Sequence, residues 1–403
     1  MRILLVTGPG GSGRTTVAAA TALAAARSGK RTLLLTADSA PALGLPMGTG
    51  PGEVTEGLWA ARIDSGAHFR RELLAFQERS TAALDLLGSR KLEDEELTEL
   101  PGSEQFALLR GLRDLRGGGW DVAVVDMPPL RETIALLGLP EQLRRYLRRL
   151  LPPERQAARA LRPMLAQLAG VPMPAQWLYE TAARWETELS AVQELIDDRN
   201  TSVRLVAEPG PAAEDALPSA RLGLALYGMR VDALVANRIL PTASPDLWLA
   251  GLQAQQEKVL RRWHQESRAQ SAPLLSVAHA GRDPRGLDDL AALVGDGGAN
   301  GLAAGLELRA AGPVDPWDIR RATSSNKAHE DEFHWVLPLP GALKEELGLV
   351  RRGDELLISV GPFRRVLSLP SVLRRCTVSG AGLRDGELRV RFTPDPAVWP
   401  QGR

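Results

Sequence analysis

Residues 2–16 read RILLVTGPGGSGRTT, and this stretch decides the fold. The apolar run over residues 3–7 predicts a buried strand, and the alanine-rich run over residues 17–26 predicts a helix that follows it. The residues between these runs fit the frame G-x-x-x-x-G-[K]-[ST] of a phosphate-binding loop. Glycines let main-chain N–H groups converge on phosphate oxygens, and the N-terminus of the next helix adds its positive end. The sequence therefore predicts a phosphate site at the first strand–helix junction.

The loop departs from that frame at Arg14, which stands where the motif has lysine. Arginine is larger, planar and forked, whereas lysine presents a compact ammonium group. Only five of the 49 basic residues are lysine, so the replacement follows a bias of the whole chain. Thr15 occupies the position whose hydroxyl ligates Mg²⁺. We expect the loop to bind phosphate through Gly10, Gly11, Ser12, Gly13, Arg14, Thr15 and Thr16.

Further short runs rich in β-branched and aliphatic residues follow along the chain, and most are continuously apolar. Such runs are typical of strands that are covered on both faces, and the helical stretches between them are what parallel strands require. The sequence therefore predicts an α/β fold with a doubly wound, mostly parallel sheet. The runs are 3–7, 32–36, 122–125, 203–206, 234–236 and, more weakly, 274–277.

Two gaps between these runs are too long for a single crossover helix, and we expect helical inserts at about 65–115 and 140–200. Apolar residues recur at helical spacing over 161–168 and over 185–196. These stripes either pack against the sheet or each other, or form a groove for a hydrophobic protein segment.

The pattern becomes β only near the C-terminus. Leu356, Ile358 and Val360 alternate with other residues, and a second alternating run follows the turn Asp385-Gly386. We expect a nucleotide-binding domain over 1–296, a linker over 297–332 and an all-β sandwich over 333–403.

Composition excludes several classes of function. The chain has 49 basic and 49 acidic residues, which gives no electrostatic case for nucleic acid or an anionic membrane as a partner. Cys376 is the sole cysteine, so the chain has no internal disulfide framework and no all-cysteine zinc site. No apolar helical stretch approaches the roughly 20 residues that span a bilayer. We expect a cytoplasmic protein without an integral membrane segment.

The phosphate loop resembles the deviant loop of the arsenical-pump-driving and tail-anchored-protein-targeting ATPases, whose pattern is Gly-Lys-Gly-Gly-Val-Gly-Lys-Thr-Thr. In that family the first lysine reaches across a dimer to the partner's nucleotide. Pro9 takes its place here, and proline has neither a cation nor an N–H. The resemblance therefore implies a P-loop nucleotide hydrolase that lacks both usual lysines.

Other marks of the family follow in order. Asp38 matches the aspartate that polarises the attacking water, although a helix-cap aspartate is an alternative role. Asp126 ends a strand and suits an outer contact to Mg²⁺, but Leu, Arg and Glu replace the small switch residues at 130–132. Asn237 and Pro284 match residues that contact the adenine base. The C-terminal module resembles the small-heat-shock-protein-like (alpha-crystallin) domain of some bacterial members, and the cysteines that bind zinc or arsenite are absent.

These resemblances imply ATP and Mg²⁺ as cofactors, with Asp38 and Arg14 catalytic, Asn237 and Pro284 at the base, and Thr15 and Asp126 at the metal. They also imply a homodimer, or a heterodimer with an intact paralogue, and a hydrophobic client segment. The alternative is a catalytically degenerate subunit that binds nucleotide and partners such a paralogue. A partitioning ATPase fits less well, because that group lacks the long insert and the C-terminal sandwich.

Overall fold

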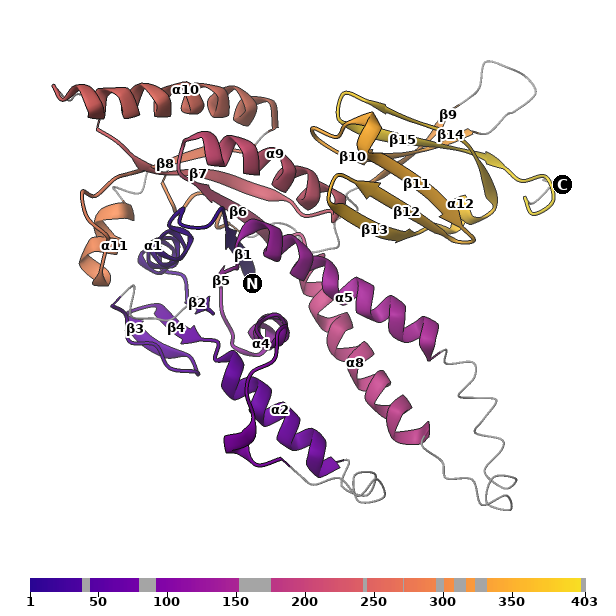
Figure 1. Cartoon of the computed structure of the whole chain (residues 1–403), viewed down its shortest axis with the longest axis horizontal. Helices are drawn as coiled ribbons and strands as arrows, with labels where there is room; N and C mark the ends of the chain where they lie inside the picture. Colours follow the sequence, from indigo (N-terminus) through magenta and orange to yellow (C-terminus); the bar gives the residue numbers. More distant parts are fainter. Residues whose placement is uncertain are drawn as a thin grey trace. The chain divides into compact units, whose positions relative to one another are not determined.

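The computed structural model describes residues 1–37, 44–79, 92–151, 175–241, 245–270, 272–294, 301–307, 317–322 and 332–399 (Figure 1). The chain forms two compact units, each assembled from separate segments. Unit 1 consists of Met1–Leu136, Asn200–Gly210 and Asp232–Ala310, and unit 2 of Leu137–Arg199, Pro211–Val231 and Ala311–Arg403.

Unit 1 is built on an eight-stranded sheet with the order β3-β4-β2-β5-β1-β6-β7-β8. The central strand β1 pairs in parallel with β5 and β6, β2 pairs in parallel with β4 and β5, and β3 is antiparallel to β4. Every residue of β1, β2, β5 and β6 is buried, which confirms the doubly wound, mostly parallel sheet. The strands are β1 (Arg2–Thr7), β2 (Thr32–Thr36), β3 (Gly52–Thr55), β4 (Leu58–Arg62), β5 (Val122–Asp126), β6 (Thr201–Ala207), β7 (Val231–Ile239) and β8 (Leu274–Ala278).

Helices cover both faces of this sheet. Because successive side chains of a strand point to opposite faces, neighbouring residues of one strand pack against different helices. Leu34 of β2 packs in one core with α1 and α11, which lie side by side (Figure 1). Leu35 faces α4, where a Cβ on Gly111 would lie 3.3 Å from a methyl group of Leu35. The helices of unit 1 are α1 (Arg14–Arg27), α2 (Ser65–Arg79), α4 (Ser103–Asp114), α10 (Leu247–Gln270) and α11 (Gly286–Val294), with short 3-10 turns at Asp94–Glu96 and Leu115–Gly117.

Unit 2 holds an all-β sandwich beside helices. Two antiparallel sheets, β14-β15-β10-β9 and β11-β12-β13, enclose a single apolar core, which confirms the predicted C-terminal sandwich. Asp385 and Gly386 both have positive φ at the turn between β14 and β15, as the sequence predicted for a tight hairpin. The strands are β9 (Asp318–Ala322), β10 (Glu332–Pro338), β11 (Leu347–Arg352), β12 (Glu355–Val360), β13 (Phe363–Ser368), β14 (Cys376–Arg384) and β15 (Glu387–Pro394).

The longer helices of unit 2 lie in or next to the second predicted insert and in the segment after β6, and a short one lies in the C-terminal sandwich. Helix α5 and α8 run side by side and are joined by Arg144 and Glu186, whose charged groups lie 3.0 Å apart (Figure 1). Leu189, Val192 and Ile196 of the 185–196 stripe are buried and Trp185 is exposed, whereas the 161–168 stripe lies outside the described residues. The helices are α5 (Leu130–Leu150, in unit 2 from Leu137), α8 (Ala175–Ile196), α9 (Pro211–Leu226) and α12 (Ser371–Arg374), with a 3-10 turn at Lys344–Glu346.

The segment predicted as a linker carries two packed pieces. The buried guanidinium of Arg204 donates to the carbonyls of Leu302 and Ala304, and Arg2 donates to that of Gly305, so residues 301–307 belong to the core of unit 1. Strand β9 pairs with β10 in the sandwich of unit 2. The limits 1–296, 297–332 and 333–403 as a whole stay a prediction.

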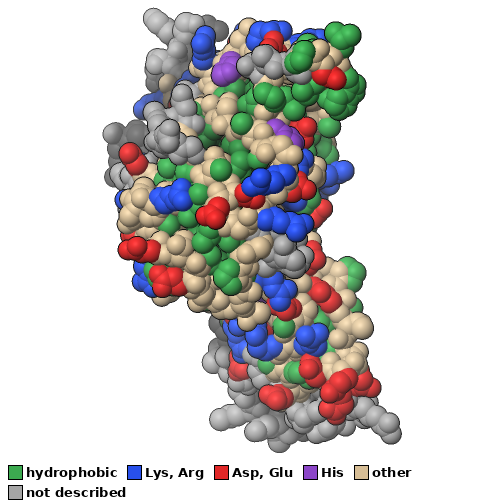
Figure 2. Space-filling view, turned by 90° about the vertical axis from the view of Figure 1, so that its left-hand side faces the viewer, with side chains coloured by type: hydrophobic (Ala, Val, Ile, Leu, Met, Phe, Trp, Pro, Cys, Tyr) green, Lys and Arg blue, Asp and Glu red, His purple; other side chains and the backbone are tan. Residues whose placement is uncertain are grey.

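The surface carries both signs of charge. Figure 2 shows basic and acidic side chains intermixed over the face turned to the viewer, as the equal totals of the two kinds lead one to expect. Among the helices of the described ranges, none combines the length and the apolar character needed to cross a bilayer.

Candidate functional site

The predicted phosphate loop joins β1 to α1 at the carboxyl end of the central strand. Gly11 and Gly13 have φ of 76° and 84°, a conformation that residues with a Cβ rarely adopt. Gly13 is the N-cap of α1 and has no side chain with which to cap it, and the described first turn of this helix holds no acidic residue. A helix N-terminus of this kind presents unpaired N–H groups and a positive dipole end, which suit an anion.

Two glycines of the loop approach other main-chain and side-chain atoms closely. A Cβ on Gly8 would lie 1.9 Å from the Val206 carbonyl oxygen, and one on Gly13 would lie 2.3 Å from Asn237 Nδ2. Ser12 is buried, and its hydroxyl has no hydrogen-bond partner within the described ranges. Because a buried hydroxyl normally has a partner, this orphaned group fits a loop that is completed by a polar ligand.

Strand β7 supplies two side chains to the loop through an irregularity in its pairing. Its register with β8 shifts between Ala236 and Ile239, so Asn237 and Arg238 lie in a bulge, and bulges re-aim side chains. Asn237 Nδ2 donates to the Ser12 carbonyl at 2.8 Å, and Arg238, at φ 56°, donates to the Gly11 carbonyl at 3.0 Å. The amide of Asn237, predicted to read an adenine edge, therefore also holds the loop.

Helix α10 fixes this bulge from the other side. The buried amide of Gln256 donates through Nε2 to the Arg238 carbonyl at 3.1 Å and accepts from the Leu240 N–H at 3.0 Å. These two bonds satisfy main-chain groups that the irregular pairing with β8 leaves out. The position of Asn237 and Arg238 is thus set by three elements, β7, α10 and the loop.

The segment around Pro284, which is predicted to contact the adenine base, lies close to Arg238. The Asp283 carboxylate is 3.9 Å from the Arg238 guanidinium, and Pro284, the next residue, is half-buried. Arg238 also contacts Glu208 at 3.4 Å, so one guanidinium links the phosphate loop to two acidic side chains. The structure therefore gathers the loop, Asn237 and the 283–284 segment in one region of unit 1.

The end of β5 forms the other wall. Asp126 is only 4% exposed and lies in register with Val6 of β1 and Thr36 of β2. The Thr36 hydroxyl donates to Asp126 Oδ2 at 3.0 Å, and the Arg14 guanidinium donates to the carbonyl of Met127. The charged group of Arg14 is thus engaged by the main chain next to Asp126.

Both predicted domains have counterparts among known protein families. A model described as "Anion-transporting ATPase" matches residues 1–293, and one described as "HSP20-like domain found in ArsA" matches residues 330–392. The chain belongs to the anion-transporting ATPase family. The phosphate loop and the strands described above contain the motifs through which the sequence resembles this family.

Three relatives are similar to this chain over nearly the whole length of both proteins. An uncharacterized protein of Streptomyces coelicolor is 55% identical over 409 residues, which cover 100% of each chain. A protein of Mycobacterium tuberculosis is 30% identical over 428 residues, or 99% of this chain and 97% of its own. An Aquifex aeolicus protein named "Putative arsenical pump-driving ATPase 1" is 26% identical over 420 residues, 97% of this chain and 99% of its own.

Not all of the predicted site residues lie in the part of the chain that the structure describes. Thr15 and Thr16 begin α1 beside the loop, and Asp126 lies across from it on β5, whereas Asp38 lies outside the described residues. The start of α5 is held to β1, because the buried Thr133 hydroxyl lies 3.0 Å from that of Thr7.

Sequence reasoning missed the roles of Arg238 and Gln256. Arg238 was visible beside Asn237, but neither its positive φ nor its bond to the loop can be read from the letters. Gln256 sits in an ordinary helical pattern, and only the fold brings it to the bulge.

Proposed function

We propose that the protein binds ATP with Mg²⁺ at the phosphate loop and hydrolyses it slowly. The observation that carries this proposal is the loop itself, in which two left-handed glycines lead into an uncapped helix N-terminus beside the buried Ser12 hydroxyl. Because the groups that would meet the phosphates belong mainly to the main chain, binding does not require the two lysines that this loop lacks.

Each predicted residue has a role in this proposal. Gly10, Gly11, Gly13 and the first turn of α1 bind the phosphates, and Asn237 and Pro284 contact the base. Thr15 would ligate Mg²⁺ through its hydroxyl, and Asp126 would make an outer contact to the ion. When bound, Mg²⁺ would supply positive charge to the phosphate groups. Asp38 orients the attacking water, and Arg14 supplies positive charge near Met127.

We further propose that the nucleotide state changes the affinity for a hydrophobic protein segment. Three large side chains on α5 and α8 of unit 2 are exposed, namely Tyr146, Leu150 and Trp185. In this proposal these side chains form part of the surface that binds the segment. Competition between a tail-anchor peptide and an apolar dye, with and without ATP, measures such binding. Displacement that is the same in both conditions contradicts this part of the proposal.

A second candidate function is that of a nucleotide-binding subunit without catalysis, paired with an intact paralogue. Two observations favour it. Pro9 removes the cation that would act across a dimer, and the Arg14 guanidinium is already engaged by the Met127 carbonyl. Transition-state charge is then less well compensated, because a preorganised cation contributes much of the rate in phosphoryl transfer.

Calorimetry of purified protein with ATP, with and without Mg²⁺, tests the shared part of both candidates. Heat that depends on Mg²⁺ supports a nucleotide site, and no heat with any adenine nucleotide contradicts both candidates.

Phosphate release by the wild type and by the Asp38→Asn, Arg14→Ala double variant then separates the two candidates. Equal release by both proteins contradicts hydrolysis. Turnover gained by Pro9→Lys together with Arg14→Lys assigns the defect to these two positions, and continued inactivity assigns it to the segment at 130–132.

A further inference from the structure

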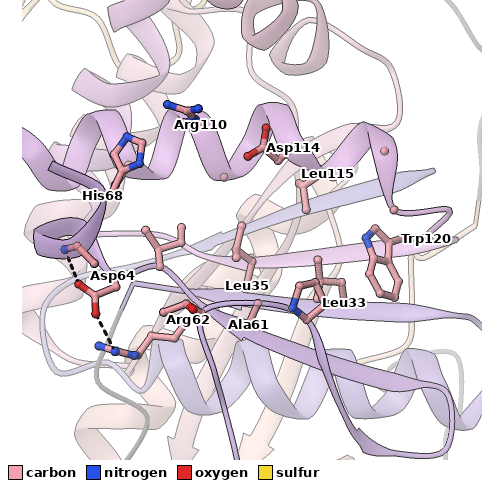
Figure 3. Close-up of a pocket in the computed structure, with 18 of the residues that line it drawn as sticks. Leu33, Leu35, Ala61, Arg62, Asp64, His68, Arg110, Asp114, Leu115 and Trp120 are labelled. Carbon is pink, nitrogen blue, oxygen red and sulfur yellow. Dashed lines mark hydrogen bonds and ion pairs between the residues drawn. The ribbon is translucent and has the colours of Figure 1, made fainter. Parts of the chain in front are cut away.

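A cavity of about 450 Å³ lies in unit 1 between α2, α4 and the strands β2 and β4 (Figure 3). Its lining includes none of the residues 8–16, Asn237 or Pro284, so it is separate from the phosphate loop. We call it the α4 cavity. Its volume is within the range of about 300–1,000 Å³ that small-molecule sites occupy. Its two ends differ in chemistry.

One end is apolar and has an aromatic wall. Leu33, Leu35 and Ala61 line it from the strands, and Trp120 closes it (Figure 3). The indole of Trp120 needs the glycine beside it, because a Cβ on Gly118 would lie 1.9 Å from Trp120 Nε1. An apolar surface of this kind is a contact area for an aliphatic or aromatic group.

The aromatic wall is held in place before any ligand arrives. The Trp120 ring centroid lies 5.5 Å from that of Trp59, and the Arg31 guanidinium carbon lies 4.7 Å from the Trp120 centroid. Cation–π and tilted ring contacts at these distances are attractive. A wall that is already ordered costs little entropy on binding, which favours affinity for a ligand.

The other end is polar and positively charged. Arg62 is paired with Asp64 at 3.0 Å, and Arg110 is paired with Glu72, so these charges are compensated. Arg71 is different: its Nη2 lies 3.3 Å from His68 Nδ1, and it has no acidic partner within the described ranges. The structure thus leaves one cation uncompensated at this end of the cavity.

The imidazole of His68 lies at the same polar end of the cavity. Burial, and next the charge of Arg110, lower the pKa of His68 from its ordinary value, and Arg71 adds to the effect against Glu72 and Asp114. A neutral imidazole whose Nδ1 faces a guanidinium accepts there and carries its proton on Nε2. His68 therefore offers an N–H donor in addition to the charge of Arg71.

We propose that the α4 cavity binds a small amphipathic anion, whose apolar body lies against Leu35 and Trp120 and whose anionic group pairs with Arg71. The separation of an apolar end from an uncompensated cation within one cavity favours this class of ligand over a neutral or a cationic one. A cation would meet the uncompensated charge of Arg71, and a neutral molecule would leave that charge without a partner.

Three eight-carbon probes test the proposal with the full-length protein: octanoate, octanol and octylammonium. Calorimetry without nucleotide is expected to show octanoate binding about tenfold more tightly than octanol, a difference of one charged contact. Octylammonium is expected to bind more weakly than octanol. Equal affinities for octanoate and octanol, or no heat with octanoate, overturn the proposal. Because no nucleotide is present, the result is independent of the proposed ATP site.

Two adjacent arginines of α2 give a matched pair of variants. Arg71 lines the cavity, whereas Arg70 does not and lies 3.5 Å from Asp94. Arg71→Gln is expected to weaken octanoate binding about fivefold, the size of one exposed charge pair, and to leave octanol binding unchanged. Arg70→Gln is expected to change neither. The Arg71 side chain is exposed and that of Arg70 is half-buried, and neither lies in the core, so both variants should fold. An equal loss in the two variants overturns the assignment of Arg71.

Discussion

The phosphate loop and the α4 cavity are two proposed sites of the same unit that are built in different ways. The loop consists mainly of main-chain groups, held by Gly11, Gly13 and the start of α1. The cavity is lined mostly by side chains, among them Trp120 and Arg71, on which the proposed ligand depends. A main-chain site can keep its shape when side chains such as a lysine change, but it depends strictly on its glycines. A side-chain site depends on the individual residues that line it.

The largest expected effect therefore comes from a single methyl group in the loop. Gly8→Ala places a Cβ 1.9 Å from the Val206 carbonyl oxygen, and this main-chain atom can move only if β6 moves. We expect a loss of about 3 kcal/mol in the free energy of unfolding, measured by urea denaturation. Gly10→Ala is the matched control, because no atom beyond its two chain neighbours lies within 4 Å of the added Cβ. Its stability should stay within about 0.5 kcal/mol of the wild type. Equal stabilities of the two variants would contradict a loop fixed by main-chain contact.

A smaller effect is expected at the side chains that hold the loop. Asn237→Ala removes the buried donor to the Ser12 carbonyl, which costs about 1–2 kcal/mol because an acceptor is left unsatisfied. ATP affinity, measured by calorimetry, should fall in parallel. Arg238→Gln is the comparison: its donor to Gly11 lies on a more exposed side chain, so we expect a loss below about 1 kcal/mol. If Arg238→Gln proves the more costly, the loop relies on the charge of Arg238 more than on the amide of Asn237.

Which features could be predicted from the sequence depends on whether their signals are local. Continuous apolar runs such as 3–7 and 122–125 predict buried parallel strands, because both faces of each strand need cover. The phosphate loop is a contiguous motif, and the turn at Asp385-Gly386 is a local one. Their signals lie within a few residues of each other, so a single sequence suffices to predict them.

The rest depends on contacts between distant residues. The bond from Asn237 to Ser12 joins positions 225 apart and needs the bulge in β7. The α4 cavity takes its lining from β2, β4, α2 and α4, and no pattern in any one of these segments indicates a cavity. Arg2 and Arg204 look like surface charges in the sequence, yet both are buried and bind the carbonyls of residues 302–305. Such features follow from the packing of the chain and not from local periodicity.

The smallest expected effect is a pH dependence that belongs to the cavity. The pKa of His68 is lowered in the folded protein from 6.5, chiefly by burial. As the pH falls, the unfolded chain therefore takes up a proton at this residue before the folded protein does. The stabilisation is complete above about pH 6.5 and is lost as the pH falls below that value toward the lower, folded pKa. His68→Gln should remove this part of the decline between about pH 7.5 and pH 5.5, measured by urea denaturation.

The same residue links proton uptake to the proposed ligand. An anion beside His68 favours its protonated form, so octanoate should bind more tightly to the wild type as the pH falls from about 7.5 to 5.5, and octanol should not. In His68→Gln the octanoate affinity should lose this dependence, because no imidazole remains to be protonated. A slope that persists in His68→Gln would assign the titration to another group and would separate His68 from the anion. In that case the cavity would depend on Arg71 alone, and the contrast with the main-chain loop would rest on a single side chain.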